Sequence, residues 1–138
     1  MKPNKYIPGD LVKIVLDDKE QVVKVIGYDP TYKRYLLANE YIYETRGCVS
    51  VTEDEIVLIP LTPEILDNNG WRKLKSKRYT WWKARFDGTY YFIKPNKDYP
   101  SIWELCRGNT RHRFRKIKYV HQLQHFLFGL DLNSNMNL

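Results

Sequence analysis

The sequence lacks the features of disulfide-stabilised and membrane-spanning proteins. Only two of its 138 residues are cysteines, Cys48 and Cys106, and they lie far apart in the chain. Two cysteines cannot form a zinc site by themselves, and we expect two buried free thiols. No apolar run approaches the roughly 18 residues that a membrane-spanning helix needs. The charged start of the chain has no apolar stretch behind it, so we expect no secretory signal and a cytoplasmic location.

The short motifs of many enzymes are also missing. The sequence has no glycine-rich phosphate loop, no nucleophile elbow and no paired-acid signature. His121 and His125 have the four-residue spacing of two metal ligands on a helix, but Gln122 stands where the metalloprotease motif has glutamate. A pair of structural histidines is the simpler interpretation. We therefore expect a non-enzymatic protein with no catalytic residue, no metal and no cofactor.

Acidic residues are scarce in the second half of the chain. Residues 1–60 carry eight Lys and Arg against ten Asp and Glu, whereas residues 61–138 carry 15 against six. The net charge of +7 therefore arises entirely in the second half, where Trp, Tyr and Phe are interleaved with the cations. A basic surface with aromatic rings can hold a phosphate backbone and stack bases. This pattern predicts nucleic acid or an acidic protein as the partner.

The first half reads as β structure throughout residues 8–59. The expected strands are 11–16, 22–28, 34–38, 48–51 and 55–59. Short strands separated by turn signals at such spacing are typical of a small antiparallel barrel. The segments Gly9-Asp10-x-Val12 and Val25-Ile-Gly-Tyr-Asp29 resemble those of Src-homology-3-like barrels. The hydrophobic content of 43% is sufficient for a real core.

A short helix at residues 63–68 is predicted to join the two halves. Thr62 is a good N-cap, Pro63 suits the first helical position, and Asn69-Gly70 favours a left-handed end.

Beyond that helix, residues 71–118 predict a second, hairpin-rich sheet. Its turn signals are Asp87-Gly88-Thr89 and Gly108-Asn109-Thr110. A C-terminal helix is expected over residues 119–128, with Val120, Leu123, Leu127 and Phe126 on its apolar face. The predicted class is α+β, mostly β. It has a barrel subdomain at 1–60, a basic subdomain at 61–130 and a flexible tail at 131–138.

Two basic clusters are the candidate binding residues. The first, with its aromatic neighbours, is Arg72, Lys73, Lys75, Lys77, Arg78, Trp81 and Trp82. Adjacent strand residues point to opposite faces, so only one of the two tryptophans should be exposed for stacking. The second cluster is Arg107, Arg111, Arg113, Arg115, Lys116 and Lys118. Strand alternation would put Arg111, Arg113 and Arg115 on one face, where they repel one another and favour an anionic partner.

Two segments taken together, Pro60–Trp71 and Ile117–His125, resemble a family of short accessory proteins carried by phages and integrated mobile elements of bacteria. The resemblance spans about residues 8–130 and assigns no site. It implies a small protein that acts on nucleic-acid machinery in the host cell. Some such proteins inhibit CRISPR effectors, which suggests competition for guide or target RNA.

The sequence therefore predicts a module that binds RNA, another single-stranded nucleic acid or a host nucleoprotein such as a CRISPR effector through residues 71–118. One alternative is a virion structural component or a protein–protein adapter. Another is an RNase that uses His112. The sequence leaves open the identity of the partner, the oligomeric state and whether the two halves are independent domains.

Overall fold

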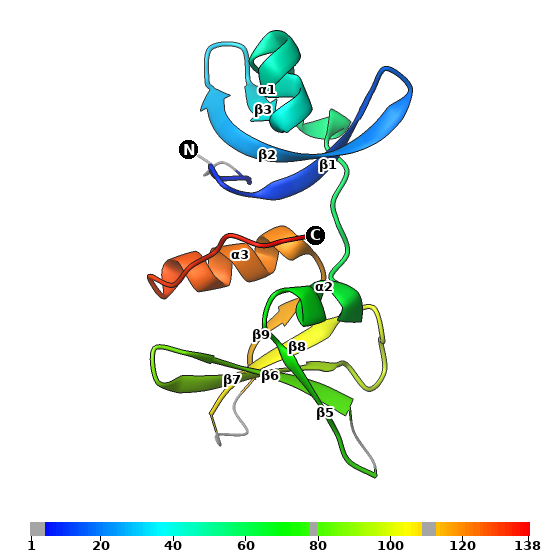
Figure 1. Cartoon of the computed structure of the whole chain (residues 1–138), viewed down its shortest axis with the longest axis vertical. Helices are drawn as coiled ribbons and strands as arrows, with labels where there is room; N and C mark the ends of the chain where they lie inside the picture. The colour runs from blue at the N-terminus through cyan, green and yellow to red at the C-terminus, as the bar shows by residue number, and fades with distance from the viewer. Residues whose placement is uncertain (1–4, 78–79, 109–112) are drawn as a thin grey trace. The chain divides into compact units, whose positions relative to one another are not determined.

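A computed structural model of the chain describes residues 5–77, 80–108 and 113–138 (Figure 1). The chain forms two compact units, Met1–Ile59 and Pro60–Leu138, called here the N-terminal and C-terminal units. Their division lies one residue before the predicted boundary. The N-terminal unit holds a four-stranded antiparallel sheet and the C-terminal unit a five-stranded one. The predicted class, α+β and mostly β, is confirmed.

The N-terminal sheet follows the order of the chain. Its strands are β1 (Leu11–Leu16), β2 (Lys19–Asp29), β3 (Arg34–Ala38) and β4 (Val49–Val51). Asp17 and Asp18 both have positive φ, 53° and 62°, and form the two-residue turn between β1 and β2. Such a turn matches the twist of the strands that it joins. Alternate residues of these strands form the core, which includes Val12, Ile14, Val23, Val25 and Leu37.

The predicted fifth strand, 55–59, is reduced to a single bridge. After β4 the chain forms the 3-10 helix η1 (Glu53–Glu55), and Val57 then pairs with Lys13 of β1. Two backbone hydrogen bonds of 2.8 Å join these two residues. The segment after one edge strand thus returns to the opposite edge strand, as in a closing barrel.

Helix α1 (Glu40–Arg46) was not predicted, because residues 8–59 were expected to be β throughout. Asn39 is its N-cap and its side-chain oxygen accepts from the Ile42 N–H at 2.7 Å. Gly47, with a φ of 76°, follows the last helical residue. Aromatic and β-branched residues in this segment favour a strand, but the N-cap and the burial of Ile42 stabilise a helix instead.

The C-terminal unit contains a meander of five strands and two helices. Its elements are α2 (Pro63–Asn68), β5 (Arg72–Lys75), β6 (Thr80–Phe86), β7 (Thr89–Pro95), β8 (Trp103–Arg107), β9 (Arg113–Ile117) and α3 (Val120–Gly129). The predicted turn at Asp87-Gly88 is confirmed, and both residues have positive φ. Residues 72–75, inside the region predicted to be a hairpin-rich sheet, form strand β5 and pair with β6.

Both predicted helices of this unit are confirmed. The Thr62 hydroxyl accepts from the Ile65 N–H at 3.3 Å and caps α2. Val120, Leu123 and Leu127 of α3 are buried, and the Phe126 ring contacts Tyr91 at 5.8 Å between centroids. In Figure 1, α2 and α3 lie on the same side of the five-stranded sheet.

The C-terminal segment 131–138, predicted to be a flexible tail, makes hydrogen bonds to α3 and to Asn69. The Asn69 side-chain amide donates to the Asn137 carbonyl and accepts from the Asn137 N–H, both at 2.7 Å. Gln124 Nε2 donates to the Ser134 carbonyl at 3.2 Å. Figure 1 shows this segment, in red, running back along α3. The amide of an asparagine side chain has both a donor and an acceptor, so it can bond the N–H and the C=O of one residue as a neighbouring strand does.

The cysteines are free, as predicted, but Cys48 is exposed and Cys106 is half-buried, so the expectation of two buried thiols is wrong. Among residues 5–77, 80–108 and 113–138, no helix is long and apolar enough to cross a membrane.

Candidate nucleic-acid interface

The two faces of the five-stranded sheet differ in what covers them. Residues directly opposite on paired strands share a face, so the register assigns each side chain. The covered face holds Trp82, Ala84, Tyr91, Ile93, Trp103, Leu105 and Ile117, all buried. Helix α3 packs on this face through the contact of Phe126 with Tyr91, and α2 through the hydrogen bond that Asp67 accepts from the Trp82 indole. These seven side chains form the core of the unit.

The opposite face, called here the open face, is basic and aromatic. By register its members are Arg72, Leu74, Trp81, Lys83, Arg85, Tyr90, Phe92, Lys94, Glu104, Cys106 and Lys116. Five of these carry a positive charge and one carries a negative charge. All are exposed or half-buried except Glu104. Both helices of the unit lie on the other side of the sheet, so the described helices leave these side chains uncovered.

The three aromatic rings of the open face lie on the β6–β7 hairpin, beside cations. Trp81 and Phe92 are 5.8 Å apart between centroids, with their planes inclined at 46°. Lys83 Nζ lies 4.0 Å from the centroid of Tyr90 and 5.9 Å from that of Phe92. The Arg85 guanidinium carbon lies 5.4 Å from the Tyr90 centroid. Cations at these distances are attracted by the negative faces of the rings, which holds Lys83 and Arg85 above the sheet.

The single acid of the open face is buried and already engaged. Glu104 is 3% exposed. It lies 3.8 Å from Lys94 Nζ and accepts from Asn96 Nδ2 at 2.9 Å. Its carboxylate therefore offsets the charge of Lys94. Lys83 and Arg85 instead lie beside the Tyr90 ring. The surface around the three rings is positively charged.

The structure separates the two predicted tryptophans as strand alternation requires. Trp81 is half-buried on the open face. Trp82 is 4% exposed, donates its indole N–H to Asp67 Oδ1 at 3.0 Å and contacts the Trp103 ring. Trp82 is therefore a core residue, which removes it from the candidate stacking residues and leaves Trp81.

Of the predicted basic residues whose side chains the structure describes, Arg72 and Lys116 lie on the open face, together with Trp81. Four other members pair with residues of the covered face and are exposed at its margins, Lys73, Lys75, Arg107 and Arg115. Lys77 and Lys118 are exposed and lie outside the strands. Arg78 and Arg111 lie outside the described residues, and so does His112, the predicted residue of the RNase alternative. Both basic clusters are therefore divided between the two faces of the sheet.

The predicted row of Arg111, Arg113 and Arg115 depended on strict alternation along one strand. The register shifts between Leu105 and Cys106, so that Leu105 pairs with Arg115 and Cys106 with Arg113. Such a bulge interrupts alternation. Leu105 and Cys106 are neighbours on β8 and face opposite sides of the sheet. Their pairing with Arg115 and Arg113 therefore does not support a common face for the predicted row of arginines.

Five residues of the open face were missed as site residues: Lys83, Arg85, Tyr90, Phe92 and Lys94. The signal for them was present in the sequence. A two-residue turn at Asp87-Gly88 fixes the pairing of Arg85 with Tyr90 and of Lys83 with Phe92. Trp82 and Ala84 alternate with Lys83 and Arg85 along the strand, which indicates that the apolar pair lies on the opposite, buried face. What the sequence did not supply was the side on which the helices pack.

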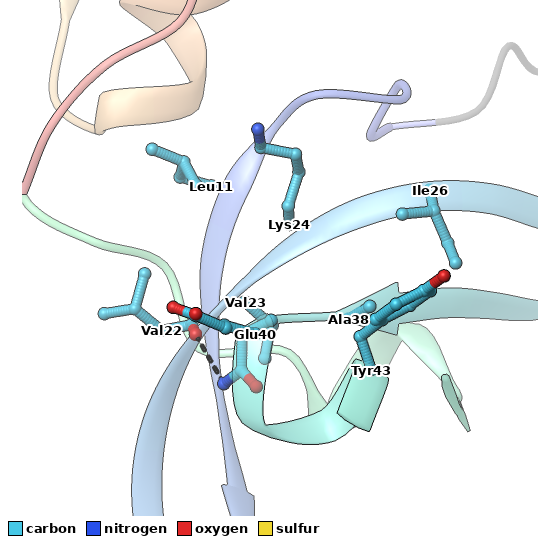
Figure 2. A pocket seen from close by; sticks show the side chains of 9 residues that line it. Leu11, Val22, Val23, Lys24, Ile26, Ala38, Glu40 and Tyr43 are labelled. Carbon is cyan, nitrogen blue, oxygen red and sulfur yellow. Dashed lines mark hydrogen bonds between the residues drawn. The ribbon is translucent and has the colours of Figure 1, made fainter. Parts of the chain in front are cut away.

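A second surface feature lies on the N-terminal unit, between β2 and α1. It is a shallow groove of about 450 Å³, lined by Leu11, Val22, Val23, Lys24, Ile26, Ala38, Asn39, Glu40 and Tyr43 (Figure 2). Ile26 lies at a register shift of β2, and its side chain is 47% exposed. Tyr43 is 74% exposed. The groove is mainly apolar, with Lys24 and Glu40 as its charged members.

The histidine pair gives no indication of a metal site. The rings of His121 and His125 lie 5.4 Å apart on α3, and His121 is buried. Within the part of the chain that the structure describes, no group of three His, Cys, Asp or Glu side chains could hold a metal ion.

Comparison of the chain with protein-family models, with curated proteins and with solved structures finds no significant match. The chemistry of the open face is therefore the basis on which a function can be proposed.

Proposed function

We propose that the protein is a non-enzymatic module that binds nucleic acid through the open face of its C-terminal sheet. The observation that supports this is the composition of that face: five cations and three aromatic rings with one acid, which is buried. Like charges repel one another, so a cluster of cations on a surface without an anionic partner is unfavourable. A polyanion with stackable bases matches both the charge and the rings.

In this proposal the cations provide affinity and the rings provide preference for exposed bases. Lys83, Arg85 and Lys116 neutralise phosphates and release condensed counterions. Trp81, Phe92 and Tyr90 offer faces or edges to bases. Stacking accepts every base, so little sequence specificity is expected.

Intrinsic fluorescence gives a direct test, because the chain has four tryptophans and three of them, Trp71, Trp82 and Trp103, are buried. Trp81 is the only one at the proposed interface. Titration with oligouridylate at low salt should quench its emission, and Trp81→Phe should abolish that quenching while binding persists in a filter assay. Binding with no change in Trp81 emission would place the ligand elsewhere on the protein.

The charge contribution is tested with a matched pair of variants. Lys83→Gln with Arg85→Gln removes two charges from the open face. Lys19→Gln with Lys97→Gln removes two exposed charges outside it. The first variant should bind labelled RNA much more weakly than the second at the same ionic strength. Equal losses would show that net charge, rather than this face, governs binding.

We further propose that the ligand in the cell is the nucleic acid of a host nucleoprotein in a bacterial cytoplasm, as for an anti-CRISPR-type inhibitor. The resemblance of segments 60–71 and 117–125 to phage and mobile-element accessory proteins supports this version. The test is inhibition of RNA-guided cleavage by a purified effector. The open-face variant Lys83→Gln/Arg85→Gln should lose the inhibition, and the control Lys19→Gln/Lys97→Gln should retain it.

A protein–protein adapter is the second candidate, and the groove between β2 and α1 favours it. Its exposed apolar side chains, Ile26 and Tyr43, could hold an apolar segment of a partner. Ile26→Ser with Tyr43→Ser should then abolish capture of that partner without changing RNA binding. If RNA does not bind the wild-type protein even at low salt, the adapter becomes the preferred function.

A further inference from the structure

Resting on the proposed function, we infer that the open face takes an extended single strand that runs along the β6–β7 hairpin, with one base at each of its three rings. The inference concerns the form of the nucleic acid, which charge alone does not define. It follows from the spacing of the rings and from their pairing with cations.

The three rings form a row along the hairpin. Phe92 and Tyr90 are two residues apart on β7, and this corresponds to about 6.8 Å along the strand. Trp81, on the neighbouring strand β6, continues the row with its centroid 5.8 Å from that of Phe92. The first spacing, 5.8 Å, and the second, about 6.8 Å, are both close to twice the spacing of stacked bases, which is about 3.4 Å per nucleotide of one strand.

This spacing excludes a stacked helix as the ligand of all three rings. Bases that stack on one another lie too close together to occupy successive rings, and in a duplex each base already has a base on both faces. A strand whose bases are pulled apart to the spacing of the rings has its base faces free. The open face therefore fits an unstacked single strand, and it would bind a duplex only through phosphates.

Each of two rings also has a cation directly across the hairpin. Lys83 pairs with Phe92, and Arg85 pairs with Tyr90. A nucleotide supplies one base and one phosphate, so a ring and a cation in cross-strand register match its two parts. Lys83 Nζ now lies over the Tyr90 ring. A base stacking there displaces this ammonium, which becomes available for the adjoining phosphate.

The experiment measures affinity for oligothymidylates of increasing length, from one nucleotide upward, at low salt. Affinity should rise steeply with each nucleotide up to the third and more slowly thereafter, where only phosphates are added. An abasic scan of a longer oligonucleotide keeps every phosphate and removes one base at a time. Removal of bases from three successive positions should lower affinity more than tenfold in total. The same strand annealed to its complement should bind at least tenfold more weakly.

Ring variants complete the test. Phe92→Leu and Tyr90→Ala should each weaken binding of the single strand and leave binding of the duplex unchanged, thereby reducing the preference for single strands. Tyr99→Ala removes an exposed ring outside the open face and is the matched control. If single strand and duplex bind equally and the ring variants have no effect, the inference fails while the proposed function stands. If neither form binds, the proposed function fails as well. Loss of binding in the Tyr99→Ala control would show that the strand does not run along the β6–β7 hairpin alone, and would overturn the inference.

Discussion

Lys83 Nζ lies 4.0 Å from the centre of the Tyr90 ring, across the β6–β7 hairpin. At a partly exposed site such a contact is worth about 0.5–1 kcal/mol, so the ring favours one position of a cation on a flexible side chain. Arg85 lies at 5.4 Å from the same ring. Two cations around one ring, beside the Trp81–Phe92 pair, define the centre of the open face.

The salt dependence of binding should report the joint contribution of these two cations. For a single strand, the slope of log affinity against log salt is about −0.7 for each phosphate neutralised. Lys83→Gln and Arg85→Gln together should therefore reduce the magnitude of the slope by about 1.4. The melting temperature should change little, because both cations are at least partly accessible to solvent and exposed charges contribute little stability. An unchanged slope would mean that these two residues contact no phosphate.

Replacement of the two adjacent tryptophans should have opposite consequences. Trp82→Phe loses the hydrogen bond to Asp67 and part of a buried ring, and should lower the free energy of unfolding by about 2–3 kcal/mol. Trp81→Phe keeps an aromatic ring on the open face and should cost less than about 1 kcal/mol. Urea denaturation of both variants measures the difference. Equal losses would contradict the assignment of Trp82 to the core and Trp81 to the surface.

The cap of α2 should contribute measurably to stability. Thr62→Ala removes the oxygen that accepts from the Ile65 N–H and should lower the free energy of unfolding by about 1 kcal/mol. Thr62→Ser keeps the hydroxyl and is the matched control. A urea midpoint that is the same for the Ala and Ser variants would show that the hydroxyl does not stabilise the helix.

The link between Asn69 and Asn137 should protect the C-terminal tail. Asn69→Ala removes both 2.7 Å hydrogen bonds to the backbone of Asn137. Amide exchange at Asn137, followed by NMR, should become faster by about tenfold, since a lost hydrogen bond of about 1–1.5 kcal/mol opens the site to that extent. The neighbouring substitution Asn68→Ala, at an exposed helical position, should leave this exchange rate unchanged.

The N-terminal unit should lose stability at high pH through Tyr35. Burial raises the pKa of its phenol, which packs between Tyr6 and Tyr28. Below the ordinary tyrosine pKa of about 10, both folded and unfolded states keep the proton. Above it the unfolded chain ionises first, so the free energy of unfolding falls until the pH passes the raised pKa of the folded state. Tyr35→Phe should make this fall shallower, whereas Tyr43→Phe, at an exposed position, should not.

Features that depend on a few neighbouring residues could be predicted. Thr62 and Pro63 act on the first turn of α2 and Gly70 acts just after its last turn, and α2 has the predicted limits. The turn at Asp87-Gly88 likewise depends on residues that accept positive φ. The alternation of Trp81 and Trp82 follows from strand geometry alone. Each of these signals is local, so no knowledge of the rest of the chain was needed.

Features decided by contacts between distant residues were missed. Helix α1 depends on the burial of Ile42 against the N-terminal sheet as well as on its cap. The tail is held by an asparagine 68 positions away in the sequence. The bulge between β8 and β9 changes which residues of β8 lie opposite Arg113 and Arg115, and nothing near Arg113 in the sequence indicates it.

The sequence by itself determined the class of the fold, the charge asymmetry of the chain and the presence of aromatic residues among the cations. Tertiary structure decided which of those cations share a surface with the rings. The physical reason is that a strand presents alternate residues to both sides, and only the packing of α2 and α3 against one side buries Trp82 and leaves Trp81, Lys83 and Arg85 on the other. That packing joins residues that are far apart in the chain, and no local pattern specifies it.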